Sequence, residues 1–167
     1  SVTYTTEITQ DAYARDMDQW TGSWSTSNYQ GGGQDGDMVG VLYQMFNTDT
    51  IHNVQVFISD MTAVNTSFVV KLLTFNEEWT EITSSQIQII DSEDDAGKWY
   101  SIDFPAEQPF EVGTDEMVEV MAAVEYYPAG EEFRLGIDGT VPTNGHETFM
   151  YFVGEDTWYY YGGSHVP

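Results

Sequence analysis

The sequence predicts an all-β protein, an antiparallel β-sandwich of jelly-roll type, and three observations support this fold class. Short stretches of alternating apolar and polar residues recur along the chain, and a turn signal follows each of them. No stretch shows the spacing of an amphipathic helix. Aromatic residues make up 15% of the 167 residues, which suits a β-rich chain with one sizeable core. We therefore expect residues 1–167 to form a single β-sandwich domain; a closed barrel is the alternative, and the unequal strand and loop lengths favour the sandwich.

The segment from Met117 to Tyr127 is the best candidate for a central strand. Alternate side chains of a strand point to opposite faces, which divides this segment into two sets. The set expected to be buried is Val118, Val120, Ala122, Val124 and Tyr126. The set expected to be half-solvated is Met117, Glu119, Met121, Ala123, Glu125 and Tyr127. A helix is the competing interpretation, but Gly113 and Pro128 punctuate both ends of the segment.

The other strands follow from the same alternation. The Thr-rich segment from Val2 to Ile8 predicts a first strand, whereas Asp11 to Ser27 has no clear period and predicts a loop with short extended pieces. The glycine-rich stretch from Gly31 to Asp37 predicts a flexible loop, since it lacks the spacing of a phosphate-binding loop. Pro105 and Pro109 are expected to bracket a connection between strands. The remaining predicted strands are Met38 to Phe46, Ile51 to Ser59, Phe68 to Phe75, Trp79 to Ile82, Gln86 to Ile90, Trp99 to Phe104, Phe133 to Ile137, Thr148 to Val153 and Thr157 to Tyr161.

The net charge of −24 arises from 28 Asp and Glu residues against four Lys and Arg residues. Such a chain repels phosphate backbones and anionic membrane surfaces, which argues against nucleic-acid partners. Solubility or a saline environment explains the charge in general terms. A more specific explanation is the binding of Ca²⁺, which prefers carboxylate oxygens.

Cysteine is absent, so the chain has neither disulfides nor thiolate metal ligands. This composition is compatible with many bacterial surface proteins. No run of about eighteen apolar residues occurs, so we expect no membrane insertion. The sequence begins at Ser1, and we expect any targeting segment to have been removed or to lie outside the given sequence.

A diffuse pattern of apolar and turn residues between Ile51 and Trp158 resembles a known family. Its features are the valine-rich strand Val54 to Ile58, Trp79, the segment Gly97 to Phe104 and the long strand from Met117. Together they resemble a jelly-roll module of secreted Bacteroidota surface proteins, often those exported by the type IX system. The resemblance implies a non-catalytic, extracellular or cell-surface part of a larger adhesin or enzyme. It also implies a further strand after the one containing Trp158, which we expect to follow Pro167 or to be supplied by another chain.

One acidic loop is a candidate calcium site. Asp91, Glu93 and Asp95 alternate within the segment that ends at Gly97. The spacing differs from that of an EF-hand, because the glycine comes one position late and no twelfth-position glutamate follows. A solvated hairpin turn is the simpler interpretation.

Two aromatic stretches form the candidate ligand site. Trp158 and Tyr160 fall on one side of a predicted strand, and Trp20 and Trp24 could extend an aromatic platform for stacking on sugar rings. Aromatic packing at an end of the sandwich is the simpler alternative.

Catalytic signatures are missing from the sequence. His52, His146 and His165 lack the paired spacing of zinc ligands, and no Gly-x-Ser-x-Gly motif occurs. Pairs of carboxylates arise by chance in so acidic a chain. We therefore expect no enzymatic activity.

The sequence thus favours a non-catalytic extracellular module that acts in surface adhesion or as a structural subunit of an assembly. The alternative is a carbohydrate-binding module, with Ca²⁺ as an optional aid. The expected partners are surface glycans or other copies of the chain. In the second case the strand from Val2 to Ile8 would complete the sheet of a neighbouring copy and build a filament.

Overall fold

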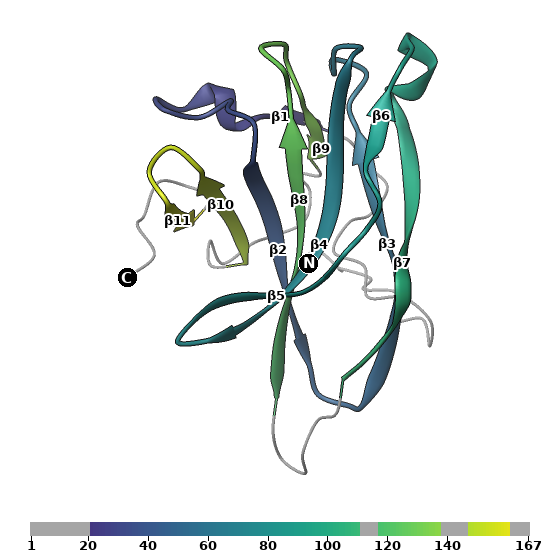
Figure 1. Ribbon diagram of the computed structural model, residues 1–167, viewed down its shortest axis with the longest axis vertical. Coiled ribbons are helices and arrows are strands. Elements are labelled where there is room, and N and C mark those ends of the chain that lie inside the picture. Colours follow the sequence, from purple (N-terminus) through teal and green to yellow (C-terminus); the bar gives the residue numbers. More distant parts are fainter. Residues whose placement is uncertain (1–20, 111–116, 138–146, 161–167) are drawn as a thin grey trace, which may run out of the picture.

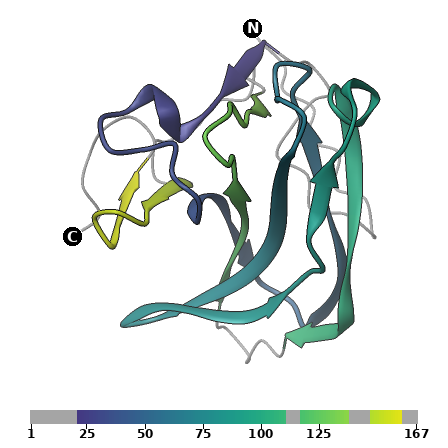
Figure 2. The same ribbon diagram turned by 45° about the horizontal axis from the view of Figure 1, so that its top comes forward.

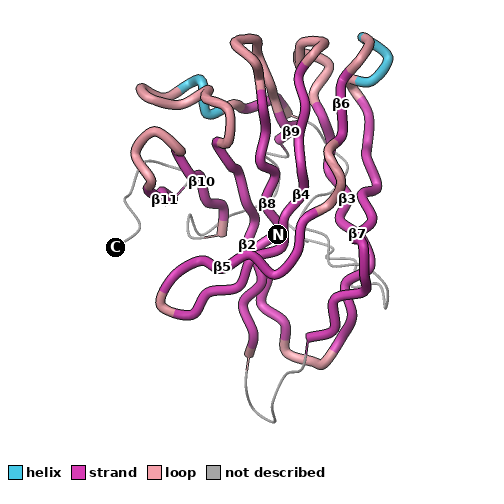
Figure 3. Tube along the Cα trace, viewed as in Figure 1, coloured by secondary structure: helices cyan, strands magenta, loops and turns pink. Residues whose placement is uncertain are grey.

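The computed structural model describes residues 21–110, 117–137 and 147–160, and most of these residues lie in strands (Figure 3). Within these ranges the only helices are two single turns of 3-10 helix, so the all-β class is confirmed. None of the helices in the described part of the chain is long or apolar enough to span a bilayer. The elements are β1 (Gly22–Trp24), η1 (Thr26–Asn28), β2 (Asp37–Met45), β3 (Asp49–Ile58), β4 (Thr66–Asn76), β5 (Glu78–Ser84), β6 (Gln88–Ile90), η2 (Glu93–Asp95), β7 (Lys98–Phe110), β8 (Val118–Tyr127), β9 (Leu135–Ile137), β10 (Thr148–Phe152) and β11 (Thr157–Tyr160).

Two antiparallel sheets pack against each other (Figure 1). The four-stranded sheet has the order β1-β9-β3-β7 and the seven-stranded sheet the order β11-β10-β2-β8-β4-β5, with β6 also paired to β4. The pairs are nested along the chain: β1 pairs with β9, β2 with β8, β3 with β7, and β4 with β5 and β6. This nesting is the jelly-roll arrangement, to which the β10–β11 hairpin adds two strands beside β2.

The main core lies between the two sheets. Val120, Val124 and Tyr126 of β8 are buried there, and Val118 and Ala122 pack against the same cluster. This confirms the face of the central strand that the sequence predicted to be buried. The cluster also contains Met45, Ile58, Phe68, Val70, Leu72, Ile90, Ile102, Phe104 and Phe133.

The opposite face of β8 differs from its prediction. Met121 and Ala123 are fully buried, whereas the sequence predicted a half-solvated face. Their cover comes from β4, β5, β10 and β11, elements distant in sequence, and alternation within one strand does not reveal it. Glu119, Glu125 and Tyr127 on this face are half-buried, as predicted.

The connection predicted at Pro105 and Pro109 is also wrong, since β7 continues through both prolines to Phe110. Among the described strands, β7 pairs only with β3 in its sheet and is an edge strand. An edge position tolerates proline, because a missing N–H on the open side removes no bond of the ladder. The predicted strand Val2 to Ile8 lies outside the described residues.

Candidate functional site

The outer face of the seven-stranded sheet, turned away from the four-stranded sheet, carries a contiguous row of aromatic rings. Three strands separate β5 from β10 in the sheet order, a distance of about 19 Å along a flat sheet. Yet the rings of Trp79 on β5 and Phe149 on β10 are only 5.4 Å apart. The β4–β5 hairpin therefore curls across this face towards β10 and β11 (Figure 2).

Four of these rings, which we call the aromatic strip, are partly or largely exposed. The strip consists of Phe75, Trp79, Trp158 and Tyr151. The ring centroids lie 5.1 Å apart for Phe75 and Trp79, 6.0 Å for Trp79 and Trp158, and 5.2 Å for Trp158 and Tyr151. The strip thus runs without a break from the β4–β5 hairpin to the β10–β11 hairpin.

A second, smaller apolar cluster forms the floor beneath the strip. We call it the outer cluster; its buried members are Leu42, Leu73, Met121, Ala123 and Phe149. The sequence favours close packing here because Gly40 of β2 has no side chain. A Cβ on Gly40 would lie 2.4 Å from the Met121 sulfur. Trp79 and Trp158 of the strip therefore rest on a packed base, which limits their motion and favours a fixed binding surface.

A charged triad lies beside the strip on the same face. Lys71 Nζ lies 2.6 Å from Glu125 Oε2 and 3.0 Å from Glu81 Oε2. Burial opposes the charge of Lys71, but hydrogen bonds to Glu125 and Glu81 outweigh it and raise the pKa of Lys71 above its ordinary value. Lys71 is therefore charged at neutral pH. The triad offers carboxyl oxygens as hydrogen-bond acceptors and an ammonium donor to a polar ligand.

The other end of the strip has its own carboxylate. The Tyr151 hydroxyl donates a hydrogen bond to Asp156 Oδ1 at 2.5 Å. This bond raises the pKa of Tyr151 to about 12. At neutral pH the phenol is protonated and its ring is held in a fixed orientation beside Trp158.

Trp79 contributes an unusual feature in the middle of the strip. Its indole Nε1–H is buried and has no hydrogen-bond acceptor among the described residues. An unmet donor of this kind costs about 1–3 kcal/mol.

Trp158 and Tyr160 both lie on this face, as the sequence predicted for residues that share one side of a strand. Both are half-buried and pack against the outer cluster. Trp24 lies elsewhere: it is 8% exposed and belongs to an interior cluster with Met150 and Phe152. The structure therefore does not bring Trp24 to the candidate platform. Trp20 lies outside the described residues.

The predicted calcium residues lie on a surface turn and do not converge. Asp91 and Glu93 are exposed. Asp95 accepts hydrogen bonds from the Ser92 hydroxyl at 2.8 Å and from Lys98 Nζ at 3.0 Å. The hydrogen bond from Lys98 has the larger effect and that from Ser92 the next, and both lower the pKa of Asp95. Throughout the part of the chain that the structure describes, no three His, Asp or Glu side chains are grouped to hold a metal ion.

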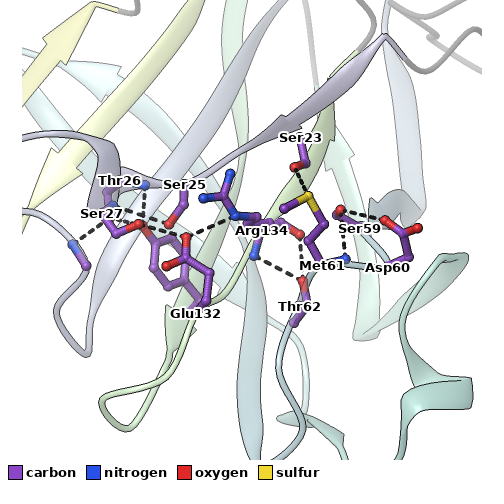
Figure 4. A network of polar contacts seen from close by, with 12 residues as sticks. Ser23, Ser25, Thr26, Ser27, Ser59, Asp60, Met61, Thr62, Glu132 and Arg134 are labelled. Carbon is purple, nitrogen blue, oxygen red and sulfur yellow. Dashed lines mark hydrogen bonds and ion pairs between the residues drawn. The ribbon is translucent and has the colours of Figure 1, made fainter.

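Polar side chains at one end of the sandwich hold loops together (Figure 4). Ser27 donates to Glu132 Oε1 at 2.8 Å, and Arg134 Nε lies 3.1 Å from the same oxygen. The Thr62 hydroxyl exchanges hydrogen bonds with the backbone of Arg134. These contacts join three parts of the chain: the turn η1, the segment that precedes β4 and the segment that precedes β9. We therefore assign them a structural role.

Beside this network, the fully buried Asp37 fixes the glycine-rich loop. Its carboxylate accepts hydrogen bonds from the Thr26 hydroxyl at 2.7 Å and from the backbone N–H groups of Gly33 at 2.8 Å and Val153 at 3.0 Å. Thr26 also contacts the Tyr126 hydroxyl, and burial raises the pKa of Tyr126. This carboxylate is satisfied by its own protein, so it is structural rather than a ligand site.

The comparisons with known proteins do not assign this site. No protein-family model matches the chain, and a search of curated proteins finds no significant similarity. The resemblance to Bacteroidota surface modules therefore stays a prediction. The sequence interpretation found Trp158 and Tyr160 but missed Phe75, Trp79, Tyr151 and Lys71. The curl of the β4–β5 hairpin brings these residues together, and local sequence patterns do not encode it. The only signal in the sequence is that each residue lies in or beside a segment of alternating apolar and polar residues.

Proposed function

We propose that this protein is a non-catalytic module that works outside the cell, in surface adhesion, by binding carbohydrate along the aromatic strip. The observation that carries the proposal is the continuous row of partly exposed rings on a packed floor, flanked by fixed charged groups. Binding sites combine apolar and aromatic surface with a few polar groups that fix orientation. The jelly-roll architecture also occurs in lectin domains, which is support by analogy only.

The chemistry of the strip fits the two sides of a sugar ring. Trp79, Trp158 and Tyr151 offer flat apolar surface for the C–H face of a pyranose. Glu81 and Glu125 accept hydrogen bonds from hydroxyl groups, and Lys71 donates them. The negative field of the whole molecule favours a neutral or cationic glycan over a sulfated or phosphorylated one.

A glycan array followed by calorimetry tests the proposal. We expect binding to neutral oligosaccharides, with a loss of about tenfold or more for Trp158→Ala. Trp158→Phe should retain part of the affinity, since it keeps an aromatic surface. The matched control is Phe46→Ala, because Phe46 is an exposed ring that belongs neither to the strip nor to the outer cluster. Equal binding by Trp158→Ala and the wild-type protein would exclude the strip as the site, and absence of binding to every glycan would refute the carbohydrate proposal.

A further inference from the structure

The open edge at β6 combines three features that favour pairing with another strand. Strand β6 pairs with β4 on one side, and the described residues place no strand on its other side. Ile87 and Ile89 are 55% and 53% exposed. The nine residues from Ile82 to Ile90 carry no charge, although Glu81 and Asp91 flank them in a chain of net charge −24.

The edge at β7 shows how this protein protects an open strand elsewhere. Pro105 and Pro109 lie within β7, and Asp103 and Glu107 are exposed along it. Proline and charge on an edge strand are the usual means of preventing strand-to-strand association. The segment from Ile82 to Ile90 has neither, so its edge is open to a partner strand.

We propose that β6 is a self-association edge, at which a second copy of this chain adds its own β6 in antiparallel register. The charge of the protein indicates which partner strand occupies this edge. A cationic partner would be drawn to the carboxylate-rich surfaces, whereas this uncharged edge is a place where an equally acidic molecule can approach without facing carboxylates. The proposal is independent of carbohydrate binding.

A two-fold axis at Gln88 gives a pairing that suits the side chains as well as the backbone hydrogen bonds of the two strands. In that register Ile87 lies opposite Ile89 of the second copy, and Ile89 lies opposite its Ile87. Alternation places both isoleucines on one sheet face, so the dimer joins them in a single apolar row. The interface is isologous and closes at two copies.

Salt dependence gives the first test, by sedimentation equilibrium of the full chain. Two molecules of charge −24 repel each other, and about 1 M NaCl shortens the screening length to about 3 Å. We expect a reversible dimer that is stronger at about 1 M than at about 0.1 M NaCl. A protein that stays monomeric at high concentration in both salts contradicts the proposal.

Variants locate the interface. Ile89→Asp places like charges on the pairing edge of both copies and should weaken the dimer about 100-fold. Its melting temperature should stay close to the wild-type value, because Ile89 is exposed in the monomer. The matched control is Met61→Asp, which changes a side chain that is 59% exposed and lies outside the edge. Unchanged association of a folded Ile89→Asp variant overturns the proposal.

Cross-linking tests the register directly and does not depend on the folding of the aspartate variant. The chain has no cysteine, so a single Gln88→Cys substitution gives a protein with one thiol. Pairing about residue 88 brings the two Cα atoms within the range of about 4.4–6.8 Å that a disulfide needs. We expect a disulfide dimer from Gln88→Cys and none from Met61→Cys under the same mild oxidation; its absence from both refutes this register.

Deletion of Ser1 to Gln10 separates self-pairing from strand exchange. The β6 dimer should survive the deletion unchanged. If the deleted chain loses its association, the edge is filled by the segment from Val2 to Ile8 of another copy, and the β6–β6 pairing is wrong.

Discussion

The two faces of the seven-stranded sheet are both apolar at their centres, but different layers cover them. The inner face packs against a complete second sheet and forms the main core. The outer face has no second sheet among the described elements; two hairpins, β4–β5 and β10–β11, supply its cover. Phe149 is buried under this cover, but Trp79 and Trp158 are only partly buried, so these two rings are both the upper layer of a core and part of the surface.

This difference suggests where stability and binding reside. Inner residues such as Val120 are surrounded by apolar neighbours and contribute to stability alone. The outer rings gain fixed positions from the floor beneath them while keeping one side available to a ligand. The predictions below test this comparison, from the largest expected effect to the smallest.

Substitution of the inner face should have the largest effect. Val120 is 1% exposed, and Val120→Asp places an unpaired carboxylate in the main core. We expect a loss of about 4 kcal/mol or more in the free energy of unfolding, measured by urea denaturation. Wild-type stability of this variant would contradict the register of β8.

A substitution beneath the strip tests whether the outer cluster is a true core. Met121 is fully buried, so Met121→Ala should cost about 2–4 kcal/mol. Met117→Ala is the control, since Met117 precedes the same strand and is 42% exposed; its cost should stay below about 0.5 kcal/mol. Similar small costs for both variants would favour the half-solvated face that the sequence predicted.

The sequence was sufficient to predict one of these faces but not the other. Period-two alternation identifies every second residue from Val118 to Tyr126 as the inner face of β8. The prediction succeeds because a sandwich always covers one side of a central strand. The same alternation holds in the predicted strand from Ile51 to Ser59, where Val54, Val56 and Ile58 pack against or belong to the main core. Local patterns were therefore enough for the core between the sheets and for most strand positions, but not for the continuation of β7 through its two prolines.

Burial of the outer face depends on contacts between distant parts of the chain. Trp79 meets Phe149 and Trp158 only because the β4–β5 hairpin curls over the sheet. No local spacing encodes that curl, so Met121 and Ala123 looked half-solvated. For the same reason Trp24 could not be identified from sequence as an interior residue, since its partners Met150 and Phe152 come from the far end of the chain.

The charged triad on the outer face should contribute a moderate amount of stability. Lys71→Met leaves Glu125, with a side chain 14% exposed, without its cation. We expect a cost of about 1–2 kcal/mol at neutral pH in chemical denaturation. Lys98→Met is the control, because Lys98 and Asp95 form an exposed pair on the surface turn, and its effect should be small. An equal effect of both substitutions would show that the outer triad is as solvated as the surface pair.

The smallest effect concerns two tyrosines that the β10–β11 turn places on opposite faces. Tyr151 on the outer face donates to Asp156, and Tyr159 packs on the inner side against Phe152 and bonds to Glu155. Each carboxylate disfavours the tyrosinate beside it, and the pKa of both phenols is raised. Asp156→Asn should lower the pKa of Tyr151 from about 12 towards its ordinary value of 10.0 and leave that of Tyr159 unchanged. Glu155→Gln should do the reverse.

NMR titration of ring-labelled tyrosines measures both values in each variant. The folded pKa of Tyr151 lies above the unfolded value, so its hydrogen bond adds stability that is fully present below about pH 10. That contribution is lost as the pH rises from about 10 through about 12, and Asp156→Asn should remove this part of the alkaline dependence. A shift of both tyrosines by either single substitution would mean that the turn is one coupled unit, and that the two faces are not electrostatically separate at this edge.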